Sequence, residues 1–80
     1  MRLDKYLKVS RIIKRRTVAN DACDAGRVTI NSKPAKAGAD VKIGDIIEIR
    51  FGENYTRAEV LSLDENPRKE AAAQMFRILE

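Results

Sequence analysis

The sequence predicts an α+β domain in which two N-terminal helices pack on one side of a small antiparallel β-sheet. Apolar residues in the first part of the chain recur at helical spacing, whereas after Gly26 they alternate as in strands with one buried face. Residues that favour turns separate the alternating runs. A chain of 80 residues has room for one domain with one small core.

The first helix is expected over about residues 3–13. Its apolar residues form one stripe at 100° per residue, and they are Leu3, Tyr6, Leu7, Val9 and Ile13. Because Tyr6 falls within this stripe, we expect it in the core rather than on a surface that stacks nucleic-acid bases. Cations occupy the opposite side and the flanks, namely Lys5, Lys8, Arg11, Arg15 and Arg16.

A short second helix is expected to follow the basic stretch RIIKRRT, with Thr17 as its N-cap. Its apolar side consists mostly of small residues, which are Val18, Ala19, Ala22, Cys23 and Ala25. Gly26 stands where a helix often ends in a left-handed residue, a conformation that glycine adopts without steric cost. The small side chains predict that another element approaches this helix closely.

The strands are expected after Gly26. Val28 and Ile30 alternate in the first strand, and Asn31 tolerates the positive φ that a following tight turn requires. A Gly44-Asp45 turn precedes the next strand, which begins at Ile46 and in which apolar residues alternate with polar ones. The alternating residues are Ile47, Ile49 and Phe51.

The last third of the chain adds a hairpin and a short helix. Gly52 and Asn54 indicate a hairpin that leads into the alternating run YTRAEVLSL. From Pro67 onward the composition is typical of a short C-terminal helix, and a strand for the final FRIL remains open.

Positive charge is concentrated in the N-terminal half. Residues 1–36 hold ten Lys and Arg against three Asp and Glu, a net of +7, whereas residues 37–80 hold six against nine, a net of −3. Within the first sixteen residues, seven cations accompany a single acid, Asp4, so pairs within one helix cannot neutralise them. One strongly basic face on a small domain predicts a nucleic-acid partner.

The sequence argues against an enzyme, a cofactor and a metal site. It contains no histidine, the most frequent general base and metal ligand. Cys23, the single cysteine, lies on the apolar side of its helix and is expected to be buried and inert. The four glycines are scattered rather than grouped in a phosphate-binding loop. No run is apolar enough for a signal peptide or a membrane span, so we expect a cytoplasmic protein.

The charge distribution favours RNA over DNA. Two consecutive short helices invite comparison with a helix-turn-helix, but the second helix carries Asn20, Asp21 and Asp24 and no cation. Two acids would be repelled from a major groove. Cations on the first helix and at the junction suit recognition of a folded RNA surface by its shape.

Three segments resemble the RNA-binding domain named after ribosomal small-subunit protein S4. They are RLDKYL, RRTVANDACDAGRVTINSKPAK and VKIGDIIEI, and together they lie within residues 1–51. The matching positions are Arg2, Leu3, Asp4, Arg16, Ala19, Gly26, Val28, Ile30, Asn31, Val41, Gly44 and Asp45. Arg15 stands where many members have serine, and Ser32 replaces the usual glycine. The resemblance implies an S4-type RNA-binding domain over residues 1–51, the helix-rich αL motif, with residues 52–80 completing the same single domain.

A stand-alone S4-type domain of this length is similar to the fifteen-kilodalton heat-shock protein family, especially its short branch of ribosome-associated quality-control factors (the RqcP type). The runs KVSRIIKRRT and KEAAAQMFRIL favour that branch. The resemblance implies a monomer that binds large ribosomal subunits obstructed by peptidyl-tRNA. It also implies contacts with rRNA and P-site tRNA, and a functional partner of the RqcH type that directs alanine tailing of the stalled chain.

The resemblance places Arg2, Asp4 and Arg16 against rRNA, with neighbouring cations on RNA backbone. As the one acid of the cluster, Asp4 is expected to orient Arg2 or Arg16 rather than to touch phosphate. The predicted RNA-binding residues are Arg2, Asp4, Lys5, Lys8, Arg11, Lys14, Arg15, Arg16, Lys33 and Lys36. A general binder or chaperone of structured RNA without a ribosomal address is the main alternative. A DNA-binding protein and an RNA-modifying enzyme agree less well with the sequence.

Overall fold

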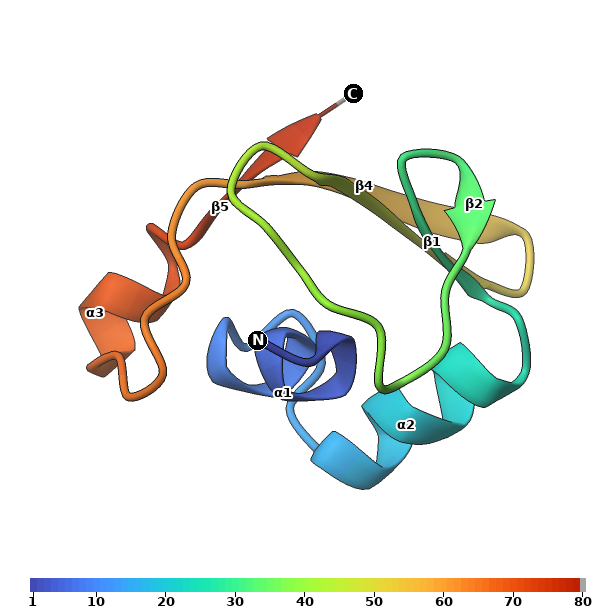
Figure 1. Ribbon diagram of the computed structural model, residues 1–80, viewed down its shortest axis with the longest axis horizontal. Helices are drawn as coiled ribbons and strands as arrows, with labels where there is room; N and C mark the ends of the chain where they lie inside the picture. Colours follow the sequence, from blue (N-terminus) through green and yellow to red (C-terminus); the bar gives the residue numbers. More distant parts are fainter. Residues whose placement is uncertain (80) are drawn as a thin grey trace.

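The computed structural model, which describes residues 1–79, confirms the predicted α+β class (Figure 1). Two helices lie against one face of an antiparallel sheet. A third, short helix lies near the sheet edge that β5 forms. In chain order the elements are α1 (Leu3–Val9), α2 (Arg16–Asp24), β1 (Val28–Ile30), β2 (Lys33–Pro34), β3 (Ile46–Phe51), β4 (Asn54–Val60), α3 (Lys69–Ala72) and β5 (Phe76–Leu79).

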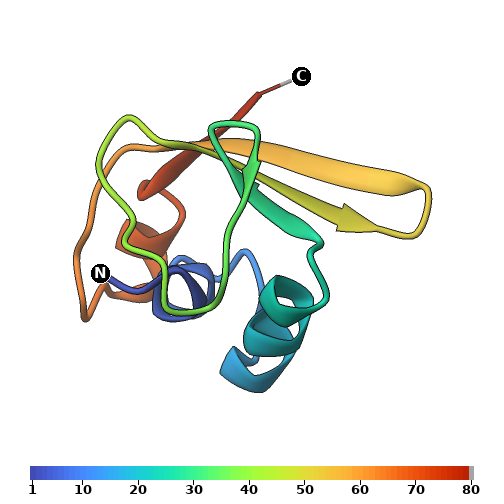
Figure 2. The ribbon, with the colours of Figure 1, turned by 45° about the vertical axis from the view of Figure 1, so that its right-hand side comes forward.

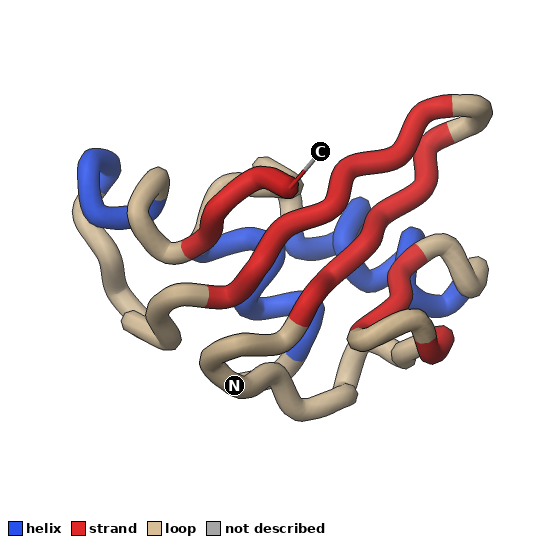
Figure 3. Tube along the Cα trace, turned by 90° about the horizontal axis from the view of Figure 1, so that it is seen from above, coloured by secondary structure: helices blue, strands red, loops and turns tan. Residues whose placement is uncertain are grey.

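The sheet has five strands in the order β2-β1-β3-β4-β5, with every neighbouring pair antiparallel (Figure 3). Its two faces differ in polarity because strand side chains alternate. The face toward the helices carries the core residues of β3 and β4, whereas the outer face carries ion pairs between Arg57 and Glu48 and between Arg77 and Glu59. One face therefore packs and the other meets solvent.

The core forms where α1 crosses the sheet. Leu3, Tyr6 and Leu7 are completely buried, as the stripe on the first helix predicted, and Ile47 and Ile49 are almost completely buried opposite them. The Tyr6 hydroxyl donates a hydrogen bond of 2.8 Å to the backbone oxygen of Met75, and burial raises the pKa of Tyr6 to about 12. This contact joins the first helix to the segment before β5.

The first helix is shorter than predicted, because it ends at Val9 rather than near residue 13. The Ser10 hydroxyl donates to the Leu7 backbone oxygen at 3.3 Å, and Arg11 adopts a left-handed conformation with φ of 65°. The chain then turns back, so that the Ile13 amide donates to the Leu7 carbonyl and the Ile13 side chain is still buried. Lys14 and Arg15 therefore belong to a connection, not to a helix.

The second helix begins at Arg16, so the prediction that Thr17 is its N-cap was wrong. Arg15 occupies the N-cap position in extended conformation, and no side chain caps the helix there. Ala19, Ala22 and Cys23 are buried as predicted, whereas Val18 and Ala25 are exposed. The predicted left-handed end is confirmed, with φ of 75° at Gly26.

The C-terminal segment contains less helix and more strand than its composition predicted. The helix α3 is four residues long, and FRIL forms β5, which pairs with β4 through Val60 and Phe76. Tertiary pairing thus outweighs the helical propensity of this stretch. The predicted hairpin between β3 and β4 is confirmed, with φ of 60° at Gly52.

The turn between β1 and β2 yields a prediction about stability. Asn31 and Ser32 both have positive φ, 52° and 71°, and only these two residues connect the paired Ile30 and Lys33. Replacing Ser32 by glycine should raise the free energy of unfolding by about 0.5–1 kcal/mol, because glycine adopts this conformation without a Cβ clash. Chemical denaturation measures the change.

The reverse substitution at the other hairpin is the matched control. Gly52→Ser should lower the free energy of unfolding by about 1 kcal/mol, because φ there is also positive. A Ser32→Gly variant no more stable than the parent would contradict the conformation assigned to this turn.

Candidate RNA-binding site

Two of the predicted cations, Arg2 and Arg16, meet at Asp4, a carboxylate that is almost completely buried although it belongs to the first turn of α1. Its Oδ1 atom accepts from Arg2 Nε at 3.2 Å and from the Lys5 amide at 2.8 Å. Its Oδ2 atom accepts from Arg16 Nε at 3.3 Å and from Asn20 Nδ2 at 3.4 Å. We call Arg2, Asp4, Arg16 and Asn20 the Asp4 cluster.

These contacts keep the carboxylate ionised. Burial of Asp4 opposes ionisation, but hydrogen bonds from Arg16, Asn20 and the Lys5 amide, together with the charge of Arg16, lower the pKa of this carboxyl below its ordinary value. About half of each arginine side chain stays exposed, 56% for Arg2 and 49% for Arg16. Asp4 therefore contacts both Arg2 and Arg16, as its expected role of orienting one of them requires.

Backbone contacts hold the start of α1 in place. The Leu3 amide donates to the Ala39 carbonyl at 2.8 Å, and the Asp4 amide donates to the Ala37 carbonyl at 3.1 Å. The N-terminal amine also pairs with Asp40 at 2.9 Å. The loop between β2 and β3 thus satisfies amide groups that a helix start leaves unpaired.

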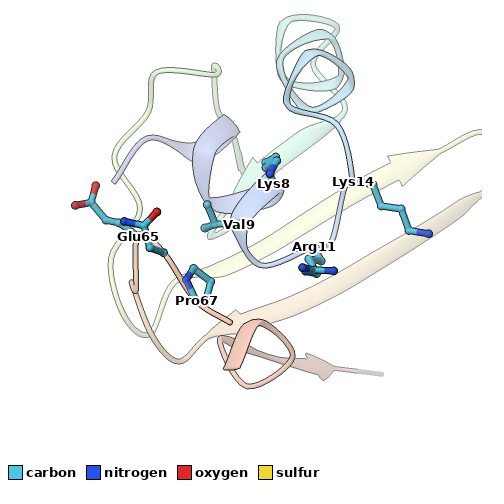
Figure 4. A pocket seen from close by; sticks show the side chains of 7 residues that line it. Lys8, Val9, Arg11, Lys14, Glu65 and Pro67 are labelled. Carbon is cyan, nitrogen blue, oxygen red and sulfur yellow. The ribbon is translucent and has the colours of Figure 1, made fainter. Parts of the chain in front are cut away.

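Three further cations line a groove on another side of α1 (Figure 4). Lys8 lies in α1, and Arg11 and Lys14 lie in the connection to α2. The groove has a volume of about 400 Å³ and is also lined by Val9, Glu65, Asn66 and Pro67. We call it the basic groove, because its lining holds three cations and one acid.

Lys5 and Glu65 connect the basic groove to the C-terminal part of the chain. Lys5 Nζ pairs with Glu65 Oε1 at 2.9 Å, and this hydrogen bond and the Lys5 charge lower the pKa of Glu65. The one acid of the groove is therefore already neutralised by a lysine outside its lining. An anion that enters the groove meets a net positive field.

The other predicted residues lie outside both the Asp4 cluster and the basic groove. Arg15 is exposed at the start of α2, and Lys33 is exposed in the edge strand β2. Lys36 is exposed in the following loop, one residue before Ala37, whose carbonyl contacts Asp4. The backbone of Lys36 therefore lies next to the start of α1, whereas Lys33 lies in the β1–β2 hairpin.

Two contributors to the site were not predicted as site residues. Asn20 lies four residues after Arg16 on the same face of α2, a spacing that could have indicated a shared partner. Glu65 is sixty residues away from Lys5 along the chain, and no local pattern announces the pair. Long-range contacts of this kind follow from the tertiary fold alone.

Other chemistry is limited in the part of the chain that the structure describes. Cys23 is completely buried, and its burial raises the pKa of the thiol to about 11, so the reactive thiolate is disfavoured. Residues 1–79 contain no cluster of acids and cysteine suited to a metal ion. None of the helices in this range has the length and apolar character needed to cross a membrane.

Comparison with known proteins gives consistent matches. The S4 domain family matches residues 1–47. The chain is 52% identical over its full length to the RQC P-site tRNA stabilizing factor of Listeria innocua, of which it covers 87%. It is 51% identical over its full length to the protein of the same name from Bacillus subtilis, of which it covers 93%.

A solved structure extends the likeness to the fold. The trimeric structure of Vibrio cholerae Heat Shock Protein 15 superposes with a TM-score of 0.89 at 30% sequence identity. The match covers 99% of this chain and 81% of the Vibrio protein. It therefore includes β5 and α3 as well as the region matched by the S4 domain family.

The lowered pKa of Asp4 predicts how acid affects stability. Because the folded pKa lies below the unfolded value, the contribution of Asp4 is fully present above the unfolded value and is lost as pH falls through the folded one. An Asp4→Asn variant should therefore be less stable by about 1–3 kcal/mol near neutral pH, and this difference should shrink in acid. Urea denaturation across a pH series measures it.

Asp21→Asn is the control, since Asp21 is exposed on α2 and its side chain makes no hydrogen bond to residues 1–79. It should follow the parent protein at every pH. An Asp4→Asn deficit that stays constant from neutral pH to strong acid would contradict the assigned ionisation of Asp4.

Proposed function

Because this chain belongs to the S4 domain family and to the family of RQC P-site tRNA stabilizing factors, we propose that it is a non-catalytic RNA-binding factor of bacterial ribosome-associated quality control. It binds the large ribosomal subunit obstructed by peptidyl-tRNA and contacts both rRNA and the P-site tRNA. In this role it acts as a monomer in the cytoplasm and supports alanine tailing directed by a partner of the RqcH type.

The observation that carries this proposal is the pair of arginines fixed by the buried carboxylate of Asp4. Arg16 uses its Nε atom on Asp4, which leaves its two terminal nitrogens for an RNA phosphate. An arginine already held in place loses less side-chain entropy on binding than a free one. The cluster thus suits tight contact with a folded RNA whose backbone presents phosphates at a matching spacing.

The basic groove supplies a second contact area. Lys8, Arg11 and Lys14 lie around it, apart from the Asp4 cluster. Two separate cationic areas allow one small domain to bind two backbone segments, as simultaneous contact with rRNA and tRNA requires. The proposed RNA-binding unit is residues 1–51, and residues 52–80 complete the same domain.

A general binder of structured RNA is the second candidate. Contacts from arginine and lysine to phosphate position a protein on RNA but carry no sequence information. Both cationic areas are of this kind, so they favour RNA without specifying a ribosomal address. The two candidates differ in their preference for large subunits that retain tRNA.

Sedimentation of the tagged protein from cell lysate separates them. The parent protein should travel with free large subunits that retain tRNA, and Arg16→Ala should remain at the top of the gradient. Arg50→Ala is the matched control, because Arg50 is exposed and lies on the outer face of β3. It loses the same charge but should sediment like the parent.

The salt dependence of binding to purified RNA shows whether the same variant has lost a phosphate contact. Arg16→Ala should reduce the slope of log Kd against log salt by about one, the change expected when one phosphate contact is lost. A parent protein that spreads over bulk RNA, with Arg16→Ala only weaker, would favour the general RNA binder. Co-sedimentation of Arg16→Ala with the subunit would contradict the role given to the Asp4 cluster.

A further inference from the structure

The hairpin of β3 and β4 extends past both N-terminal helices, so part of the core side of the sheet is left uncovered (Figure 2). Phe51 and Ile78 lie on this side and keep 43% and 53% of their surface exposed. They border a second groove of about 330 Å³, here called the apolar groove. Its lining is Arg11, Ile12, Ile49, Phe51, Thr56, Phe76 and Ile78.

Strand alternation shows that this surface continues the core. Phe51 follows the buried Ile47 and Ile49 at two-residue spacing, and Ile78 pairs with the buried Ala58. Tyr55 is 60% exposed on the same hairpin but points to the opposite face, because it alternates with Thr56 and Ala58. The apolar groove is therefore a distinct feature of the core side.

Arg11 joins the apolar groove to the basic groove, because its side chain lines both. It is also one of three non-glycine residues in this structure with positive φ. Such strain persists where the surrounding structure holds it, and it is frequent at binding sites. Here it places Arg11 between a cationic groove and an aromatic surface.

We propose that the two grooves together hold one unpaired nucleotide of the bound RNA. Its base lies in the apolar groove against Phe51 and Ile78, and its phosphate lies in the basic groove near Lys8, Arg11 and Lys14. The Thr56 hydroxyl can donate to or accept from a base edge. This inference rests on the proposed function and adds to it the chemical class of the RNA element.

RNA fits the paired grooves better than an apolar peptide or a second copy of the chain. Among residues 1–79, Arg11 is the only charged residue that lines the apolar groove. The adjoining groove holds two more cations, while its acid Glu65 is already paired with Lys5. A polyanion whose bases have flat faces that stack on aromatic rings matches an aromatic surface beside three cations. A base within a duplex cannot enter, so the grooves discriminate in favour of unpaired nucleotides.

The test compares a short RNA hairpin that carries one unpaired adenosine in its stem with the same hairpin fully paired. Fluorescence anisotropy at fixed salt should show at least about fivefold tighter binding to the RNA with the unpaired base, the lower range for one base–aromatic stack. Phe51→Leu should remove most of this preference, because it keeps an apolar side chain but deletes the ring. Phe51→Trp should restore the preference.

Two further variants complete the design. Tyr55→Leu deletes a ring on the other face of the same hairpin and should retain the full preference. Arg11→Gly suits the left-handed backbone at this position and should weaken binding to the unpaired base more than binding to the duplex. Thermal denaturation of each variant establishes that it is folded under the assay conditions.

Equal affinity of the parent for both hairpins, or a Phe51→Leu variant that behaves like Tyr55→Leu, would overturn the inference. If Arg16→Ala weakens binding to both hairpins in that case, the proposed function still stands. If the parent protein binds neither RNA, both this inference and the proposed function are wrong. A second copy of the chain is the alternative occupant of the apolar groove, and sedimentation equilibrium of the free protein tests it. Self-association that Phe51→Leu abolishes would assign the groove to that second copy.

Discussion

The buried carboxylate of Asp4 is the interaction on which the N-terminal half of the structure depends. It lies where α1, α2 and the loop before β3 meet, and it collects donors from Arg2, Arg16 and Asn20. A buried charge is tolerated only when it is paired and hydrogen-bonded, so these partners cannot move independently of one another. The same constraint that packs the two helices also holds two arginines at the surface, so local stability and the proposed RNA contact depend on one arrangement.

The second constraint is the unequal length of the two layers. The helices α1 and α2 have seven and nine residues, whereas the β3–β4 hairpin spans Ile46–Val60 and continues beyond them. A strand advances more than twice as far per residue as a helix, so short helices cannot cover a hairpin of this length. The result is an apolar surface next to the connection that carries Arg11. The uncovered apolar surface of the sheet lies next to the cationic connection between α1 and α2, because the first helix ends at Val9.

The sequence predicts the fold better than it predicts the site. Alternation identified β3 and β4, and Gly26 marked the end of α2, because these signals act over a few residues. The end of α1 was missed, since it depends on the Ser10 hydroxyl and on a left-handed Arg11, a conformation that no pattern of apolar residues reveals. Contacts across the chain, such as Lys5 with Glu65, lie beyond any local rule.

The early end of α1 also changes how the cations should be understood. On a continuous helix, residues 8, 11 and 15 would form one row of like charges, each destabilising its neighbours. The left-handed Arg11 ends that row: Lys8 and Arg11 line the basic groove with Lys14, whereas Arg15 lies outside the groove at the start of α2. The left-handed residue therefore determines which cations meet in the basic groove, the second contact area of the proposed function.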